Sequence, residues 1–328
     1  MILVTGGAGY IGSHVVLRLL EESNHEIVVF DSLENGHLST IEKLKLVRDF
    51  SFVKGDLKNK SDLENLFRNF DIDAVIHFAA YIRVEESVQN PRKYYSNNLI
   101  GTVNLLNEMI DHDVKKIVFS STAAVYGEPK YVPIDENHSK HPINPYGKTK
   151  FMVEEILDDY DKAYGLKSIR LRYFNVAGAD SQNRIGESHE PETHLIPNIL
   201  ASATDQTKVF NLFGDDYNTR DGTCVRDYVN IEDLASAHVL ALKYLSEKNQ
   251  SDCFNIGTKN GNTVKEVFES CEKITEKKIN LKINSRRDGD PESLVADNAK
   301  AEKILNWIPK KSLDDSIRTA YSWMKKQS

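Results

Sequence analysis

The chain has 328 residues, of which 40% are hydrophobic and 28% are charged, a balance typical of a soluble globular protein. This composition excludes an intrinsically disordered or fibrous protein. The 49 acidic residues outnumber the 42 Lys and Arg residues, and the resulting net charge of −7 argues against a protein that binds nucleic acid.

Three widely spaced cysteines, Cys224, Cys253 and Cys271, form no C-x-x-C pair. A sparse, odd set of this kind indicates buried thiols in a reducing compartment, and not a disulfide framework or a zinc site. The apolar runs are too short for a membrane span, and Met1–Thr5 leads directly into glycines without a secretory leader pattern. We therefore expect a cytoplasmic protein without membrane or nucleic-acid partners, and we predict no metal site.

Strand and helix patterns alternate in the first half of the chain. The predicted strands are Ile2–Thr5, Glu26–Phe30, Ser51–Lys54, Ala74–His77, Lys116–Ser120 and Ser168–Tyr173. The predicted helices between them include Ile11–Glu22, Ser61–Phe70 and Val103–Asp111. Because parallel strands need a crossover connection, which a helix provides, the fold class is predicted to be α/β with a doubly wound parallel Rossmann sheet.

The pattern becomes less regular after Asn175. Residues 178–192 are polar and predict a long connection. The predicted elements beyond it are helices at Leu195–Ala203, Glu232–Tyr244, Val264–Thr275 and Leu313–Met324, and strands at Val209–Phe213 and Val225–Val229. We expect a nucleotide-binding Rossmann domain at 1–176 and a smaller α/β substrate-binding lobe at 177–328, with segments near 225–250 returning to the first domain.

A glycine-rich sequence at Thr5–Gly12 (TGGAGYIG) follows the first predicted strand and opens the first helix. Glycines there allow a tight turn and bring backbone amides and a helix N-terminus close to a pyrophosphate. An ordinary strand-to-helix turn is the alternative, but Asp31 ends the second strand, 19 residues after Gly12, as in dinucleotide-binding folds. A carboxylate at that position binds the ribose hydroxyls and repels a 2′-phosphate, which favours NAD over NADP.

Three residues form a candidate catalytic set. Thr122 follows the fifth predicted strand, and Tyr146 and Lys150 lie 24 and 28 residues beyond it. Tyr146 and Lys150 share one face of a helix, because side chains at i and i+4 are neighbours. An ammonium beside a phenol lowers the pKa of the phenol, so Tyr146 is expected to be a general base that Lys150 keeps ionised. A solvated helix pair is the alternative for a Tyr-x-x-x-Lys sequence alone.

At these motifs the chain resembles the extended short-chain dehydrogenase/reductases, and within them the UDP-galactose 4-epimerases. The resemblance runs almost from end to end and rests on residues 5–12, 86–91, 94–98 and 101, 119–127, 145–150, 172–175, 222–228, 286–290 and 305–307. It implies Thr122, Tyr146 and Lys150 as the catalytic set, NAD as the cofactor and a UDP-sugar as the substrate. It also implies a homodimer, built through the helices that contain Asn97 and Tyr146.

The resemblance further implies which residues contact each ligand. The implied cofactor contacts are Gly6, Gly9, Tyr10, Ile11, Gly12, Asp31, Ser32, Asn35, Gly36, Asp56, Leu57, Phe78, Ala79, Ala80, Asn97, Tyr146, Lys150 and Phe174. The implied substrate contacts are Thr122, Tyr146, Asn175, His194, Phe213, Arg226, Arg287, Asp290 and Leu294. Arg226 and Arg287 match arginines that contact the pyrophosphate, although each precedes an aspartate and a surface salt bridge is the alternative.

The residues after Thr122 separate the epimerases from their relatives. The sugar-nucleotide 4,6-dehydratases carry Asp-Glu there, because they need carboxylates to eliminate water, whereas this chain has Ala123 and Ala124. We therefore expect oxidation and reduction at a single carbon. A hydride leaves the sugar C4 for NAD, the 4-keto sugar rotates, and the hydride returns to the opposite face of the sugar.

Some positions depart from the family pattern. Ile82 stands where many members have a nicotinamide-side lysine, with Arg83 beside it, and Glu85 replaces a glycine. His194 replaces an asparagine and is still able to hydrogen-bond a phosphate. Leu294 is intermediate in size between the tyrosine that restricts some members to plain hexoses and the small residue that admits N-acetylated ones, so the preferred sugar stays open.

Three alternatives accompany the prediction of a UDP-glucose/UDP-galactose 4-epimerase. The nearest is a 4-epimerase for another UDP-sugar, carrying an N-acetylhexosamine, a uronic acid or a pentose. A non-catalytic NAD-sensing protein with the same fold belongs to a different functional class, and the intact Tyr146–Lys150 pair argues against it. A structural protein without a ligand would leave the glycines of the loop without a purpose, since glycine destabilises a folded backbone.

Overall fold

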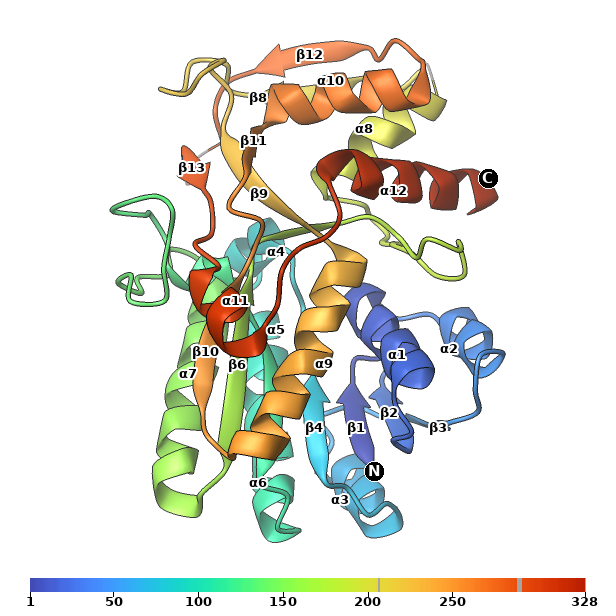
Figure 1. Cartoon of the computed structure of the whole chain (residues 1–328), viewed down its shortest axis with the longest axis vertical. Coiled ribbons are helices and arrows are strands. Elements are labelled where there is room, and N and C mark those ends of the chain that lie inside the picture. The colour runs from blue at the N-terminus through green and yellow to red at the C-terminus, as the bar shows by residue number, and fades with distance from the viewer. Residues whose placement is uncertain (206, 288–290, 328) are drawn as a thin grey trace.

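The computed structural model describes residues 1–328 except 206, 288–290 and 328. Seven parallel strands form its main sheet (Figure 1). In spatial order they are β10 (Asp252–Ile256), β6 (Lys167–Tyr173), β5 (Lys116–Thr122), β4 (Ala74–His77), β1 (Ile2–Thr5), β2 (Ile27–Asp31) and β3 (Ser51–Lys54). The strand order reverses next to β1, because β2 lies on one side of this strand and β4 on the other.

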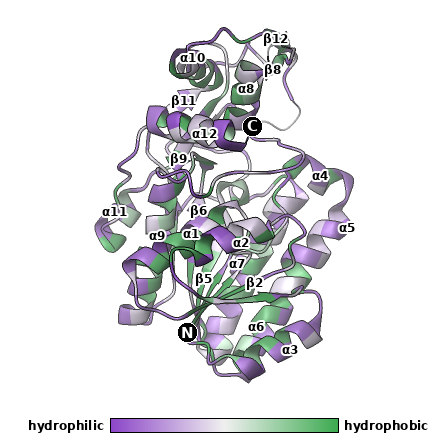
Figure 2. Ribbon diagram, turned by 90° about the vertical axis from the view of Figure 1, so that its right-hand side faces the viewer, coloured by the Kyte–Doolittle hydropathy of each residue, from purple (hydrophilic) through white to green (hydrophobic). Residues whose placement is uncertain are grey.

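Helices cover both faces of this sheet. One face packs against α1 (Tyr10–Glu22), α2 (Leu38–Lys45), α9 (Ile231–Lys248) and α11 (Ala299–Leu305). The other packs against α3 (Lys60–Asn69), α6 (Gly101–Asp111) and α7 (Pro145–Tyr164). Side chains alternate along a strand, so Val4 and Val29 lie in the first core while Leu3 and Val28 lie in the second. Figure 2 shows the resulting hydrophobic strands between helices of mixed hydropathy.

Short helical segments surround the ends of the central strands. They are α4 (Val84–Gln89), α5 (Pro91–Tyr94) and the π-helical η1 (Tyr95–Ile100), which precede α6, and the 3₁₀ turn η2 (Ala123–Val125), which follows β5. Asn144 caps α7 by accepting a hydrogen bond from the backbone N–H of Gly147 at 2.8 Å, and Pro145 occupies the first turn. This cap fixes where α7 begins, one residue before Tyr146.

A smaller part of the molecule lies beyond the carboxyl ends of the main strands (Figure 1). Its sheets consist of β7 (Asn175–Ala177), β9 (Val225–Asn230), β11 (Gly261–Thr263) and β13 (Ser293–Leu294), and of β8 (Phe210–Phe213) with β12 (Leu281–Asn284). Its helices are α8 (Leu195–Thr204), α10 (Val264–Thr275) and α12 (Leu313–Gln327). These elements share a core of their own, to which Ile199, Phe268 and Ile317 contribute.

The predicted fold class is confirmed, and each predicted strand of the first half is present to within two residues. The sequence analysis missed α2 and β10. The expected return to the main sheet involves α9, which packs against α1, and β10, which pairs with β6. β9 also lies near 225–250, but it pairs with strands of the smaller part. The division at residue 176 stays a prediction. No helix among the described residues is long and apolar enough to span a membrane.

Candidate active site

The predicted cofactor residues come together at one edge of the main sheet. Because all seven strands are parallel, the segments that follow their carboxyl ends meet there (Figure 1). Residues 6–12 follow β1, residues 32–36 follow β2, residues 56–57 follow β3 and residues 78–80 follow β4. Thr122 is the last residue of β5, and Phe174 comes directly after β6.

The glycine-rich segment that runs from the end of β1 into the first turn of α1 accepts glycine and nothing larger at two positions. Gly6 has a φ of +72°, and a Cβ on it would lie 2.6 Å from the amide nitrogen of Ala79. A Cβ on Gly12 would lie 2.2 Å from the carbonyl oxygen of Gly6. The N-terminus of α1 has no side-chain cap at Gly9 and no acidic residue in its first turn. Its backbone N–H groups and its dipole therefore suit an anion such as a pyrophosphate.

Asp31 ends β2 beside this loop. Its Oδ2 accepts a hydrogen bond from the backbone N–H of Ala8 at 2.9 Å, and its Oδ1 accepts one from Leu33 at 2.8 Å. Burial raises the pKa of Asp31, and these backbone donors partly offset that effect. Each carboxylate oxygen has a second lone pair, so the fixed side chain is still able to accept hydrogen bonds from two ribose hydroxyls.

The three predicted catalytic residues lie together at the end of β5 and the start of α7. The Thr122 and Tyr146 hydroxyls are hydrogen-bonded to each other. Lys150, one helical turn after Tyr146, donates from Nζ to the carbonyl oxygen of Ser120 at 2.8 Å. All three side chains are buried, with residue exposures of 8%, 7% and 3% in chain order. A threonine, a tyrosine and a lysine thus converge from two elements on one point of the sheet edge.

The charge states of this set differ from the prediction. Burial raises the pKa of Tyr146 to about 12, and the hydrogen bond with Thr122 offsets only part of that rise. Burial also lowers the pKa of Lys150 to about 7. The prediction that Lys150 lowers the pKa of Tyr146 is wrong for the protein without ligands, because desolvation dominates both groups and the lysine donates to Ser120. A further positive charge near the phenol is needed to ionise it at neutral pH.

A buried ion pair behind the catalytic set was not predicted. Glu154 lies one helical turn after Lys150, and its Oε2 is 2.6 Å from Nη2 of Arg172 on β6. Its Oε1 accepts hydrogen bonds from Arg172 Nε at 2.9 Å and from Ser121 Oγ at 2.6 Å. Ser121 directly precedes Thr122, so this carboxylate connects α7 with β5 and β6 beneath the site. The i, i+4 spacing from Lys150 is the only sequence signal that pointed to Glu154.

Two predicted cofactor residues have side-chain contacts that fix their position. The Tyr10 hydroxyl donates to the carbonyl oxygen of Gly178 at 2.5 Å, which connects the start of α1 with the segment after β7. Asn97, on η1, donates from Nδ2 to Oδ1 of its neighbour Asn98 at 3.0 Å.

Ile82 and Arg83, the departures from the family pattern after β4, have the following surroundings. Ile82 is 41% exposed. The guanidinium of Arg83 lies 3.2 Å from the carboxylate of Glu86, within the same short helical segment. The structure therefore shows Arg83 in a local ion pair.

Apart from Thr122, Tyr146 and Asp290, the predicted substrate residues lie in the smaller part of the fold. Phe213 ends β8, and the guanidinium carbon of Arg287 lies 3.9 Å from the centre of its ring. Arg226 on β9 and Leu294 on β13 are partners in the pairing of these two strands. The structure thus brings these four residues together in two pairs, each formed by segments distant in the sequence.

Three further substrate predictions concern single positions. Asn175 begins β7, and its side chain is hydrogen-bonded to Tyr228. His194 is the N-cap residue of α8, and its Nδ1 lies 2.6 Å from Oε1 of Glu187. Asp290 lies outside the described residues.

Comparisons with known proteins agree with this geometry. A family model described as GDP-mannose 4,6 dehydratase matches residues 3–320. The chain is 52% identical over 326 residues to a UDP-glucose 4-epimerase of Lactobacillus helveticus, covering 99% of this chain and 97% of that protein.

Solved structures extend the similarity to the fold. The UDP-glucose 4-epimerase of Brucella ovis in complex with NAD is similar with a TM-score of 0.93 and 43% identity, over 98% of this chain and 97% of that one. The enzyme of Bifidobacterium longum in complex with NAD⁺ and UDP gives a TM-score of 0.95 and 37% identity, over 99% and 98% of the two chains.

Proposed function

The chain belongs to the UDP-glucose 4-epimerase family, within the extended short-chain dehydrogenase/reductases, and we propose that it interconverts UDP-glucose and UDP-galactose with bound NAD. The enzyme is an isomerase, because one sugar carbon is oxidised and then reduced. One observation carries the proposal. Thr122 and Tyr146 are hydrogen-bonded beside Lys150 at the glycine-rich edge of the sheet, and the residues after Thr122 are alanines instead of the carboxylates that a dehydratase needs.

NAD fits the residues of this site. The uncapped start of α1 suits the pyrophosphate, and the glycines leave room for the backbone to approach it. Asp31 has acceptor capacity for the ribose hydroxyls and disfavours a 2′-phosphate. When bound, NAD accepts a hydride from the sugar and gives it back, and its oxidised ring carries a positive charge.

Tyr146 is the residue that takes the proton of the sugar 4-hydroxyl and later returns it. Thr122 donates or accepts a hydrogen bond at the 4-oxygen of the sugar, since its hydroxyl already contacts the phenol of Tyr146. Burial holds the phenol protonated, with a pKa of about 12, so positive charge beside it is required for the reaction. Lys150 and the positive charge that bound NAD would supply could together meet this requirement, and the enclosed position would strengthen their effect.

On the substrate side, we propose that Phe213 stacks on the uracil and that Arg226 and Arg287 hold the pyrophosphate. The support is geometric: Arg287 already lies over the Phe213 ring, and a guanidinium matches phosphate oxygens in a bidentate manner. Leu294 pairs with Arg226 in neighbouring strands, and we propose that it borders the sugar. Because its size is intermediate, Leu294 does not decide between a plain hexose and an N-acetylhexosamine, and the assay below compares the two.

The function is tested by an epimerisation assay on the purified protein. UDP-galactose, UDP-N-acetylgalactosamine, UDP-glucuronate and UDP-xylose are supplied separately, without added NAD and then with it. Turnover of UDP-galactose without net NADH release supports the proposal. No turnover of UDP-galactose despite bound NAD would contradict it, and the other three substrates identify which UDP-sugar is used instead.

The role of Tyr146 is tested with Tyr146→Phe. Loss of the phenol is expected to lower kcat by about 10³-fold while NAD stays bound. Tyr164→Phe, at the exposed end of the same helix, is the matched control and should keep full activity. Retention of full biological function by Tyr146→Phe would instead favour the NAD-sensing alternative.

We also infer a homodimer located in the cytoplasm. Exposed apolar side chains lie on the two helices that contain Asn97 and Tyr146, at Ile100 on η1 and Met152 on α7, and on α4 at Val88. Contact with a second copy of the chain would cover these side chains and remove their apolar surface from water. Light scattering should give twice the monomer mass, and Met152→Lys should shift the protein toward monomer.

The three cysteines are free thiols, which agrees with a reducing compartment, and cell fractionation tests the location.

A further inference from the structure

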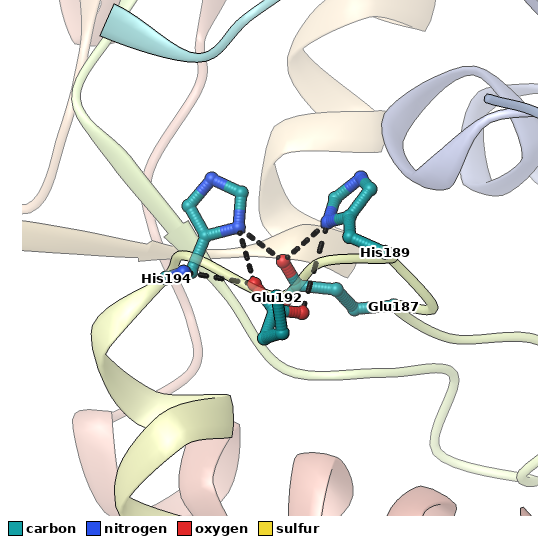
Figure 3. Close-up of side chains that lie close together, drawn as sticks. All are labelled: Glu187, His189, Glu192 and His194. Carbon is teal, nitrogen blue, oxygen red and sulfur yellow. Dashed lines mark hydrogen bonds and ion pairs between the residues drawn. The ribbon is translucent and has the colours of Figure 1, made fainter. Parts of the chain in front are cut away.

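Four ligand-type side chains converge in the connection before α8. They form the Glu/His cluster, which consists of Glu187, His189, Glu192 and His194 (Figure 3). One potential ligand atom from each residue lies within 4.8 Å of all the others. In Figure 3 both imidazole rings turn Nδ1 toward the two carboxylates, while the second ring nitrogen points away from them.

The spacing of these atoms is close to that of a tetrahedral metal site. The Nδ1 atom of His194 lies 2.6 Å from Glu187 Oε1 and 3.1 Å from Glu192 Oε1. The Nδ1 atom of His189 lies 3.1 Å from Glu187 Oε1 and 3.8 Å from Glu192 Oε2. With bonds of about 2.1 Å to a central Zn²⁺, tetrahedral ligand atoms are separated by about 3.4 Å. The shortest of these distances, 2.6 Å, must widen by about 0.8 Å, and a separation as wide as 4.8 Å must shrink by about 1.4 Å, for the four atoms to surround an ion.

The backbone around the cluster is held from two sides. Trp323, on α12, donates from Nε1 to the carbonyl oxygen of Glu187 at 2.8 Å. His37, which precedes α2, hydrogen-bonds through Nε2 to the carbonyl oxygen of Ser188 at 2.9 Å. Helices that are far apart in the sequence thus fix the segment before any ion binds. Such preorganisation lowers the entropic cost of gathering the ligands.

Outer contacts also orient the ligands themselves. Glu192 Oε1 accepts hydrogen bonds from the backbone N–H groups of Thr193 at 2.7 Å and His194 at 2.8 Å. Hydrogen bonds to a ligating carboxylate are the usual support of a protein metal site. The Glu187 side chain is only 8% exposed, so one carboxylate is already removed from water.

We propose that the Glu/His cluster binds one Zn²⁺ ion in a structural site. Two imidazole nitrogens and two carboxylate oxygens complete a tetrahedral set, which is the arrangement of a closed zinc site that keeps no open position for chemistry. Imidazole nitrogen is a borderline ligand and carboxylate oxygen is a hard one, so this set suits Zn²⁺ better than a metal ion that prefers soft thiolate ligands. This inference stands independently of the proposed epimerase reaction, since no ligand belongs to the catalytic set.

The ion has two consequences for the fold. It joins His194, the first capping residue of α8, to His189, whose ring lies edge-on to Tyr10 of α1 at 6.2 Å between ring centres. It also takes over from the two imidazole groups the neutralisation of Glu187 and Glu192, beside the predicted phosphate contact His194. The ion pairs seen between the same residues are the metal-free alternative.

The test measures metal binding directly, so its outcome does not depend on enzyme activity. Untagged full-length protein is stripped with a chelator, loaded with Zn²⁺, desalted and analysed for metal content by mass spectrometry. We expect about one Zn²⁺ per chain, and an increase in Tm of about 4 °C at a free concentration near 100 times Kd. Co²⁺ in place of Zn²⁺ should give the intense visible absorption of a tetrahedral site.

Two variants locate the ion. Glu187→Gln and His189→Gln should each weaken Zn²⁺ binding by at least about 100-fold. Glu128→Gln and His25→Gln, which change exposed side chains of the same types, are the matched controls and should bind like the wild type. The His189 variant is informative even if the buried Glu187 change disturbs folding.

Two results would overturn the proposal. If the loaded wild type keeps no zinc and excess Zn²⁺ leaves its Tm unchanged, the cluster is an ion-pair network only. If the His189 variant binds Zn²⁺ as tightly as the wild type, the metal lies elsewhere.

Discussion

The buried ion pair between Glu154 and Arg172 provides the sharpest test of how α7 is held against the sheet. The two side chains are 1% and 2% exposed, and the carboxylate contacts the guanidinium at 2.6 Å and 2.9 Å. Glu154→Gln keeps the shape and one carbonyl oxygen of the side chain but removes its charge. The guanidinium of Arg172 is then left buried without a counter-charge.

The expected cost follows from that uncompensated charge. Removing one partner of a buried ion pair destabilises a protein by about 4 kcal/mol. For a chain of this size we expect Tm to fall by about 10 °C. Since Ser121 also donates to this carboxylate at 2.6 Å, next to Thr122, kcat should fall by about tenfold as well.

The difference in stability between the wild type and Glu154→Gln also has a predicted pH dependence. Burial acts to raise the pKa of Glu154, but hydrogen bonds and charge from Arg172 outweigh it, and the net pKa lies below the usual value of 4.5. A carboxylate with a lowered pKa in the folded state stabilises the fold above its unfolded pKa and loses this effect as the pH falls through the folded value. The advantage of wild type over Glu154→Gln should therefore be constant between about pH 6 and pH 8 and shrink below about pH 4.

Urea denaturation of four proteins isolates the effect. Glu155→Gln, one residue further along α7 and exposed, is the control and should match the wild type. The double change Glu154→Leu with Arg172→Met removes both charges and should recover most of the lost stability, since an apolar pair of similar volume avoids the desolvation penalty. The reasoning fails if Glu154→Gln lies within about 1 kcal/mol of Glu155→Gln, or if the double variant is no more stable than the single one.

Three further predictions concern the cofactor edge of the sheet. Gly12→Ala places a methyl group 2.2 Å from the carbonyl oxygen of Gly6 and should abolish NAD binding, as measured by calorimetry. Gly165→Ala is the control, because a Cβ there has nothing within 4 Å although the φ is +70°. It should lower the free energy of unfolding by about 1 kcal/mol and leave the NAD affinity intact. Asp31→Asn should lower the NAD-over-NADP preference in the same assay by about tenfold, because the charge that repels a 2′-phosphate is lost. Burial lowers the pKa of Lys150 from 10.5 to about 7, so between these values the unfolded chain binds more protons and the free energy of unfolding rises with pH. Lys150→Met should therefore be more stable than the wild type when both are cofactor-free. In chemical denaturation its advantage in the free energy of unfolding should shrink by about 2.5 kcal/mol from pH 6 to pH 9. An advantage that stays constant over this range would contradict the claim that burial lowers the pKa of Lys150.

The main sheet was predictable because its strands are short, β-branched and separated by amphipathic helices. Val28 and Val29 illustrate the reason: adjacent residues are buried on opposite faces, which only a strand covered by helices on both sides allows. β10 was missed because its pairing with β6 brings together residues about 80 positions apart, and periodicity carries no information about pairing partners. α2 was missed because it buries only Ile41 and Leu44, too few to produce a clear helical period.

The site was predictable in position and less so in its charges. Parallel topology alone places Asp31 and Thr122 at the same edge, which the structure shows. The pKa of Tyr146 was predicted with the wrong sign, because a sequence shows that Lys150 is near but not how deeply both groups are buried. The Glu/His cluster lies in a connection recognised only by its polar composition, and the convergence of its four side chains depends on how the backbone folds back.

The placement of the proposed pyrophosphate and sugar contacts depends on another buried carboxylate. Asp227 Oδ1 accepts hydrogen bonds from the Thr258 backbone at 2.8 Å and hydroxyl at 2.6 Å, and its Oδ2 accepts one from Ala296 N at 3.2 Å. These bonds fix the chain on both sides of β9, including the strand that carries Leu294. Because side chains alternate along a strand, Arg226 faces away from Asp227, which argues against the salt-bridge alternative for these adjacent residues. The guanidinium of Arg226 donates from Nη1 to the carbonyl oxygen of Val225 at 2.9 Å, on the face of β9 opposite Asp227.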